Sequence, residues 1–168
     1  MDRKLDKIIL EKAKDFKTDK LTMSLGGIMN LYEDDEIKIN FDSNRTFCWD
    51  KKKQTNFIES ILLGIPISPI FVAEAEDGTW EIIDGVQRIA TVLAFFGLLE
   101  NIADEKNNFV LGKAKIIPEL EGLSVEDLNF KVKFIIKRAT VLFEVINRDS
   151  NEQIKNEIFQ RVNATKNE

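Results

Sequence analysis

The sequence contains no histidine among its 168 residues. This absence excludes Ser-His-Asp triads, imidazole general bases and histidine-dependent metal nuclease sites. Because there is only one cysteine, an internal disulfide is impossible and a structural zinc site has too few ligands. A catalytic metal, if the protein uses one, would therefore be a hard, oxygen-bound cation such as Mg²⁺.

The sequence also lacks a long apolar run and a secretion signal. No stretch approaches the roughly 18–20 uninterrupted apolar residues of a membrane span, and residues 1–16 have no signal-peptide core. Together with the single cysteine, this pattern favours a protein of the reducing cytoplasm with no membrane contact. The net charge of −5 argues against a surface that is basic throughout, although a local patch could still bind phosphates.

Short apolar segments with helical and strand periodicity predict a mixed α+β domain. Helices are expected from Thr22 or Ser24 to residues 33–36, from the N-cap Asp50 to about Leu63, after Gly85, and over residues 124–138 and 150–163. Strands are expected over residues 37–41, 68–75, 79–84 and 139–147, with a hairpin turn at Gly78. Neither G-x-G-x-x-G nor G-x-x-x-x-G-K-[ST] occurs, so a doubly wound nucleotide fold is not expected.

The sequence is predicted to form one domain over residues 1–168. Residues 100–115 are polar and poorly periodic, which is typical of a variable connection. The last helix runs into a polar turn at residues 164–168. We interpret the sequence as the N-terminal part of a longer protein.

The segment "EIIDGVQRIATVLAFF" at residues 81–96 carries the residues best suited to chemistry. Gly85 permits unusual backbone geometry and a close approach to the main chain. The first N–H groups of the helix that follows attract anions, and Arg88 can hold a phosphate oxygen with its forked donors. Glu81 and Asp84 could hold Mg²⁺, or Asp84 could orient a water molecule.

A structural interpretation of the same residues is also open. Asp84 as an N-cap, with Gln87 three residues later, resembles a capping box. Arg88 would then be a solvated helix residue. On these residues alone the structural interpretation is favoured, because helix caps are far commoner than phosphate sites.

Other positions have plainer interpretations when each is taken alone. Arg45 lies in a loop beside Phe47 and Trp49, aromatic residues that are expected to anchor the loop to the core. Arg161 and Asn163 end the last helix, as a charge that complements the helix dipole and as a C-cap. The run of lysines at residues 51–53 is interpreted as a solvated helix face. Cys48 is interpreted as a small core residue, since no histidine can activate it.

Four segments taken together show a resemblance to a known family. "RTFCWD", "SILLGIPISP", "DGVQR" and "FQRVN" follow one another between Arg45 and Asn163. Their order resembles the N-terminal domain of GmrSD-type, type IV modification-dependent restriction proteins, whose patterns include R-x-F/Y-x-W-D, D-G-Q-Q-R and F-x-R-x-N. Each motif alone is weak, and the combination is highly specific.

The resemblance implies a ParB/sulfiredoxin-like α+β fold, a small mixed sheet with packed helices. It also implies nucleoside triphosphate (NTP) binding and hydrolysis at the D-G-Q-Q-R motif, coupled to sensing modified DNA and licensing a nuclease domain in cis or in trans. Mg²⁺ would accompany the NTP. Because the nuclease motif of such proteins contains histidine, efficient DNA cleavage by this chain alone is not expected.

Residue by residue, the resemblance assigns Asp84, Gln87 and Arg88 to catalysis. It assigns nucleotide binding to residues from three segments, namely Gly85, Arg88, Arg45, Arg161 and Asn163. Asp84 and Glu81 would hold the metal. Val86 departs from the motif, because it replaces the first of the two glutamines and removes a polar contact that hydrolysis could need.

Two other functions remain open at this stage. The same basic residues could grip a DNA backbone without turnover, as in ParB-like DNA binders, in which case the affinity for DNA would depend steeply on salt. Alternatively, the chain could be an inactive fragment that serves as an assembly surface in a larger protein.

Overall fold

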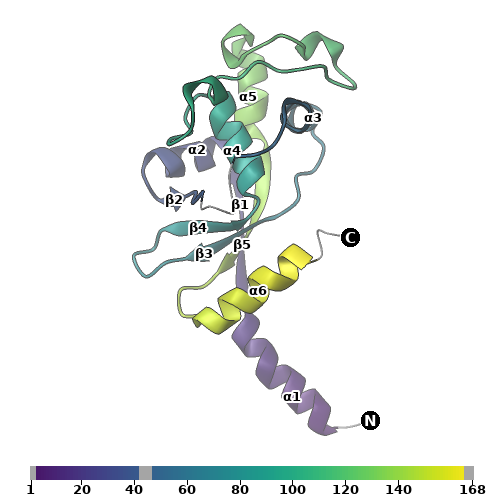
Figure 1. The fold of residues 1–168 in the computed structure, drawn as a ribbon. Coiled ribbons are helices and arrows are strands. Elements are labelled where there is room, and N and C mark those ends of the chain that lie inside the picture. The colour runs from purple at the N-terminus through teal and green to yellow at the C-terminus, as the bar shows by residue number, and fades with distance from the viewer. Residues whose placement is uncertain (1–2, 42–46, 165–168) are drawn as a thin grey trace.

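The computed structural model describes residues 3–41 and 47–164 (Figure 1). The helices are α1 (Arg3–Ala13), α2 (Leu25–Glu33), α3 (Lys51–Leu62), α4 (Val86–Phe95), α5 (Phe130–Arg138) and α6 (Glu152–Ala164). The strands are β1 (Thr18–Ser24), β2 (Ile37–Lys38), β3 (Ile70–Glu74), β4 (Trp80–Asp84) and β5 (Thr140–Ile146). Short 3₁₀ turns cover Lys14–Phe16, Asp104–Lys106, Pro118–Leu120 and Val125–Asp127.

The five strands form one mixed sheet in the order β1-β5-β3-β4-β2. β5 is antiparallel to β1 and parallel to β3. β3 and β4 form the antiparallel hairpin predicted around Gly78, and β2 pairs parallel to β4. This mixed sheet with packed helices confirms the predicted α+β class.

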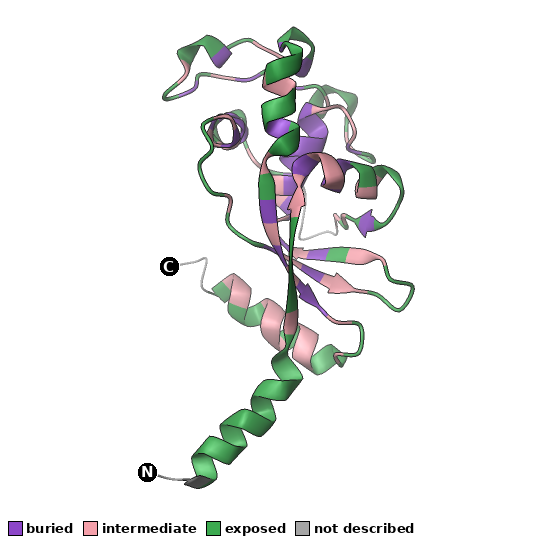
Figure 2. Ribbon diagram, turned by 180° about the vertical axis from the view of Figure 1, so that it is seen from behind, coloured by how far each residue is buried: buried purple, intermediate pink, exposed green. Residues whose placement is uncertain are grey.

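The helices lie unequally around the sheet. α2, α3, α4 and α5 gather on one side, α6 lies on the other side next to β3 and β4, and α1 projects away from the rest (Figure 1). α1 is exposed over residues 4–13 (Figure 2). Within the described part of the chain, no helix is both long enough and apolar enough to cross a membrane.

Helix α4 is the centre of the hydrophobic core. Eight of its ten residues are buried, and Ala90, Leu93, Ala94 and Phe95 have no exposed surface. Ile58 of α3, Ile70 of β3 and Phe143 of β5 are equally buried in the same cluster. A helix that is buried on nearly every side holds its first turn in a fixed place. The D-G-V-Q-R motif lies at that end.

The predicted N-cap Asp50 is confirmed, and caps also form at Ser24 and Ser124. The Ser24 hydroxyl accepts a hydrogen bond from Gly27 N at 3.0 Å, and the Asp50 carboxylate accepts one from Lys53 N at 2.8 Å. The Ser124–Asp127 capping box forms as well, but it encloses a 3₁₀ turn. The predicted helix over residues 124–138 is therefore wrong in its first part, because Asn129 caps Val132 N and starts α5 afresh.

Two strand predictions also need correction. Residues 18–24 form the unpredicted strand β1, so a helix start at Thr22 is wrong, whereas the start at Ser24 is confirmed because Ser24 is the N-cap of α2. β1 exists because it pairs along its whole length with β5, a partner far along the chain. β2 has two residues in place of the expected five, because it pairs with β4 only at Trp80 and Glu81.

Candidate functional site

Gly85 joins β4 to α4 in a left-handed conformation, with φ 102° and ψ 12°. A side chain on this residue would be strained by that backbone alone. It would also collide with the core, since a Cβ atom would lie 2.3 Å from Ile70 Cδ1. The space that glycine leaves open on this side is therefore filled by packing of β3, and it does not admit a ligand.

Asp84 is the last residue of β4 and is 6% exposed. Its carboxylate lies 3.5 Å from Arg88 Nη2. The expected capping box is wrong, because Gly85 is the N-cap of α4 and no side chain caps that position. Phe71 pairs with Asp84 and Val72 with Ile82, so β4 carries an extra residue next to the motif. Such bulges redirect neighbouring side chains.

Arg88 ties the loop before β3 to the start of α4. Its Nη1 donates to Ser68 O, and its Nη2 donates to Pro69 O at 3.2 Å. The Arg88 side chain is only 12% exposed, so the expectation of a solvated helix residue is wrong. Burial lowers the pKa of Arg88, and the Asp84 charge opposes that shift. The guanidinium is thus an internal clamp that must exchange partners before it can bind a phosphate.

Gln87 joins the motif to the segment that follows Arg45. Its Oε1 atom accepts hydrogen bonds from Cys48 N at 3.0 Å and from Trp49 N at 3.4 Å. Phe47 is 6% exposed and Trp49 packs edge-on against Phe57, so the expected aromatic anchoring of this loop is confirmed. Three of the four motif segments therefore meet at the start of α4, because Arg88 also contacts Ser68 and Pro69 of the second segment.

Two positions next to these contacts, Cys48 and Val86, differ in burial. Cys48 is exposed, so its assignment to the core is wrong. It lies between Phe47, which is buried, and Trp49, which packs on Phe57, while its own side chain is exposed. Val86, which replaces the family glutamine, is 7% exposed. An apolar residue suits that buried place, where an amide would need buried partners.

The two carboxylates predicted to hold a metal have different partners. The exposed Glu81 accepts a hydrogen bond from Asn40 Nδ2 at 2.9 Å, whereas the buried Asp84 is paired with Arg88. Within residues 3–41 and 47–164, no group of three or more His, Cys, Asp or Glu residues is placed to hold a metal ion. A Mg²⁺ ion at Asp84 would therefore need ligands from the nucleotide or from water.

The remaining predicted site residues lie elsewhere or outside the described chain. Arg161 Nε lies 2.5 Å from Glu157 Oε1, and its side chain is 79% exposed. Asn163 donates to Phe159 O at 3.0 Å, inside α6, so it does not cap the helix end. These contacts do not link α6 to the turn at Gly85. Arg45 lies outside the described residues.

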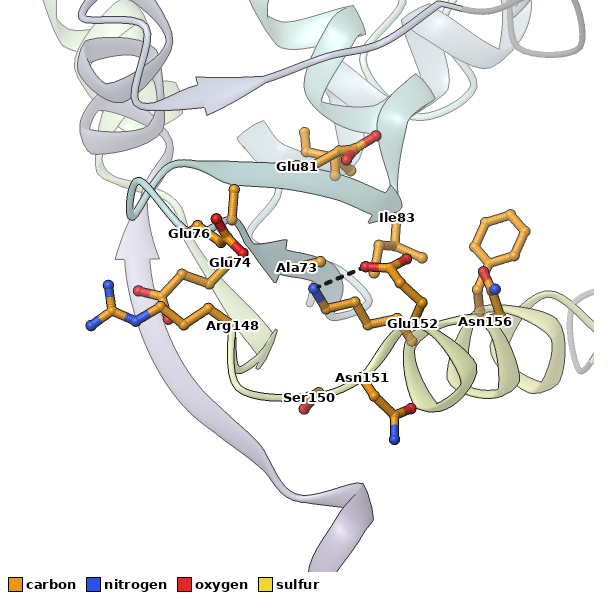
Figure 3. Close-up of a pocket in the computed structure, with 14 residues that line it drawn as sticks. Ala73, Glu74, Glu76, Glu81, Ile83, Arg148, Ser150, Asn151, Glu152 and Asn156 are labelled. Carbon is orange, nitrogen blue, oxygen red and sulfur yellow. Dashed lines mark hydrogen bonds and ion pairs between the residues drawn. The ribbon is translucent and has the colours of Figure 1, made fainter.

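A hollow of about 650 Å³ lies between α6 and the β3–β4 hairpin (Figure 3). Four acidic side chains line it, namely Glu74, Glu76, Glu81 and Glu152. Two basic side chains, Arg148 and Lys155, line it as well. Lys155 Nζ lies 3.5 Å from Glu152 Oε1. With this excess of carboxylates, the hollow repels phosphate groups. Sequence reasoning missed it because its lining comes from segments about 70 residues apart.

Comparison with known proteins gives one match. The family model described as "GmrSD restriction endonuclease, N-terminal domain" matches residues 28–168. No curated protein and no solved structure matches the chain. The ParB/sulfiredoxin-like assignment of the fold therefore stays a prediction.

Proposed function

Because the chain belongs to the family of GmrSD restriction endonuclease N-terminal domains, we propose that it binds an NTP at the start of α4. Binding and hydrolysis of the NTP would regulate a separate nuclease domain that acts on modified DNA. The observation that carries this proposal is the convergence of three segments at one helix start. Gln87 holds residues 48–49 and Arg88 holds residues 68–69.

The helix start supplies the first element of a phosphate site. The first N–H groups of any α-helix have no partner within the helix, and the helix dipole favours an anion in front of them. Because α4 is buried in the core, these groups are held in a fixed direction. Triphosphate oxygens placed there would gain hydrogen bonds at little reorganisation cost.

Arg88 supplies the second element and a route to regulation. Its planar guanidinium matches two phosphate oxygens better than it matches two separate carbonyls. If Arg88 turns to a phosphate, Ser68 O and Pro69 O lose a donor, and the loop between α3 and β3 is released from α4. Asp84 would then lose its buried partner and become available to Mg²⁺ or to a water molecule.

The other assigned residues complete the proposal. Gln87 would orient the nucleotide or the attacking water, and Glu81 would approach the metal together with Asp84. Arg45, Arg161 and Asn163 would neutralise and orient the outer phosphates. For Arg161 this requires that the ion pair with Glu157 opens, at little cost for so exposed a pair.

Calorimetric titration of the four NTPs with Mg²⁺ tests the proposal. We expect wild type to bind at least one NTP, and Arg88→Lys to bind it at least about tenfold more weakly because the fork is lost. Arg138→Ala is the matched control, since Arg138 is an exposed arginine that stacks on Phe134 at the end of α5. The control should bind as wild type does.

Thermal unfolding of each variant separates a lost site from a lost fold. If wild type binds none of the four NTPs, or if Arg88→Lys is folded at the temperature of the titration and binds as tightly as wild type, the proposal is wrong. Phosphate release measured with wild type then distinguishes an NTPase from a domain that only binds.

A further inference from the structure

A second feature, unrelated to the α4 turn, is a hollow of about 790 Å³ beside the first turn of α3. Its lining is mostly apolar and comes from two segments about 60 residues apart, which contribute the four lysines Lys51, Lys52, Lys113 and Lys115. No aspartate or glutamate lies among its lining residues. We propose that this lysine hollow binds the phosphate backbone of duplex DNA.

The 112–117 segment is held firmly against α3. Gly112 N donates to the Thr55 hydroxyl at 2.8 Å, and Thr55 has no exposed surface. The Glu59 carboxylate, 4% exposed, accepts from the backbone N–H groups of residues 115, 116 and 117 at 3.3, 2.7 and 2.6 Å. These buried side chains fix the backbone that carries Lys113 and Lys115 next to Lys51 and Lys52.

The geometry at Gly112 keeps the two lysine pairs close. A Cβ atom on Gly112 would lie 3.0 Å from Lys51 Cγ and 3.1 Å from Lys51 Cδ. The aliphatic stem of Lys51 therefore packs directly on the backbone between Leu111 and Lys113. An alanine at position 112 would require the Lys51 stem to shift by a few tenths of an ångström.

The positive charge of the hollow is not neutralised by nearby carboxylates. Glu59 is turned to the backbone N–H groups, and Asp50 caps Lys53 N. In the described ranges 3–41 and 47–164, no ion pair joins any of the four lysines to a carboxylate. On a chain with a net charge of −5, a local group of four unbalanced ammonium groups favours a polyanionic partner.

We choose duplex DNA as the polyanion because the chain belongs to a family of restriction endonuclease domains, whose substrate is DNA. Lysine binds phosphates as a flexible point charge, which suits a sequence-independent grip on a backbone. Lysines that contact phosphates release condensed counterions, and this release makes the affinity depend on salt. The inference rests on the restriction role of the family, but it does not depend on NTP binding at α4.

The test is the salt dependence of DNA binding. A labelled duplex of unmodified DNA is titrated by fluorescence anisotropy at several salt concentrations between about 50 and 200 mM. The test variant carries Lys51→Ala, Lys52→Ala, Lys113→Ala and Lys115→Ala together. The control carries Lys131→Ala, Lys133→Ala, Lys137→Ala and Arg138→Ala, which removes the same charge from α5.

We expect the test variant to bind at least about tenfold more weakly at 50 mM salt, with the slope of log K against log salt reduced by up to about 3.6, or 0.9 per lost phosphate contact. The control variant should keep the wild-type slope. Equal losses in both variants, an unchanged slope in the test variant, or no salt-dependent binding by wild type would overturn the proposal.

Two further measurements separate this inference from the proposed NTP site. The unfolding temperature of the test variant should equal that of wild type, because all four substituted side chains are exposed at the surface. Its affinity for Mg²⁺-NTP should also be unchanged. Loss of DNA binding with intact NTP binding supports the lysine hollow, and loss of both assigns the four lysines to a single shared site and overturns it.

Discussion

The starts of α3 and α4 differ in where their charges are directed. At α4 the charges are opposite, buried and paired. Arg88 lies against Asp84 and also donates to the carbonyls of Ser68 and Pro69. At α3 the lysines of the hollow share one sign and face solvent. The start of α4 can admit an anion only by rearranging. At the start of α3 the Asp50 carboxylate already caps Lys53 N, so the attraction for an anion comes from the exposed lysines beside it.

This difference assigns separate tasks to the two places. A paired, buried site responds to a ligand by breaking internal contacts, and so it can transmit the binding event to the loop it releases. An open site with one sign of charge changes little on binding and favours rapid encounter with a polyanion. A domain that senses a nucleotide and touches DNA would need both kinds of site.

The largest loss of stability is expected when a side chain is added to Gly85 in the turn before α4. Gly85→Ala should destabilise the protein by about 3 kcal/mol, since it adds a strained left-handed residue and a collision with Ile70 Cδ1. Urea denaturation measures this loss. Gly78→Ala is the matched control, because φ there is 86° but nothing lies within 4 Å of the new Cβ, and it should cost only about 1 kcal/mol.

The collision itself can be tested separately. Ile70→Val removes the Cδ1 atom, so the double variant Gly85→Ala/Ile70→Val should be more stable than the sum of the two single effects predicts. Strict additivity would mean that backbone strain alone explains the cost of Gly85→Ala.

The second largest loss of stability is expected from Glu59, which holds the backbone that carries Lys115. Glu59→Ala should cost about 2–3 kcal/mol, because three backbone N–H groups lose their acceptor in a buried place. Glu119→Ala, an exposed change in the same connection, should cost less than about 0.5 kcal/mol. Chemical denaturation of both variants gives the difference. Equal small effects would show that Glu59 does not hold the 115–117 segment.

A smaller effect is expected from the internal clamp. Arg88→Lys keeps the charge beside Asp84 but cannot reach Ser68 O and Pro69 O together, so we expect a loss of about 1–2 kcal/mol. Amide hydrogen exchange should become faster in residues 63–69 while the rest of the chain is unchanged. Uniform acceleration throughout the protein would argue against a local clamp.

The smallest effect is expected on α6. Arg161→Ala removes an exposed ion pair with Glu157 and should change the stability by less than about 0.5 kcal/mol. Titration of Arg161→Ala with NTP then tests whether Arg161 contributes to nucleotide binding. A clear loss of NTP affinity without loss of stability would bring α6 into the nucleotide site, and an unchanged affinity would leave the site to α4 alone.

Local signals in the sequence were sufficient for the elements that depend on local contacts. Ser24, Asp50 and the stripe of α4 were readable, because caps and helical periodicity involve residues three or four apart. β1 was not readable, since residues 18–24 alternate weakly and gain their strand conformation from β5. Strands of this kind are decided by a distant partner rather than by their own residues.

The turn of the candidate site could be located in the sequence, but its contacts could not be predicted. "DGVQR" marks the turn between β4 and α4, and its Asp-x-x-Gln spacing imitates a capping box that does not form. Burial decided the outcome, since Asp84 and Arg88 pair only because the core removes both from water. Likewise, Lys113 and Lys115 looked like part of a variable connection until Glu59 and Thr55 placed them beside α3.

The position of β5 in the sheet has a consequence for protein synthesis. β5 is the shared neighbour of β1 and β3, yet of the five strands of this sheet it is the last to leave the ribosome. Until residue 146 has emerged, β1 has no partner and one edge of β3 stays open. The nascent chain therefore carries exposed strand edges until β5 emerges, a state in which chaperones protect unfinished sheets from aggregation.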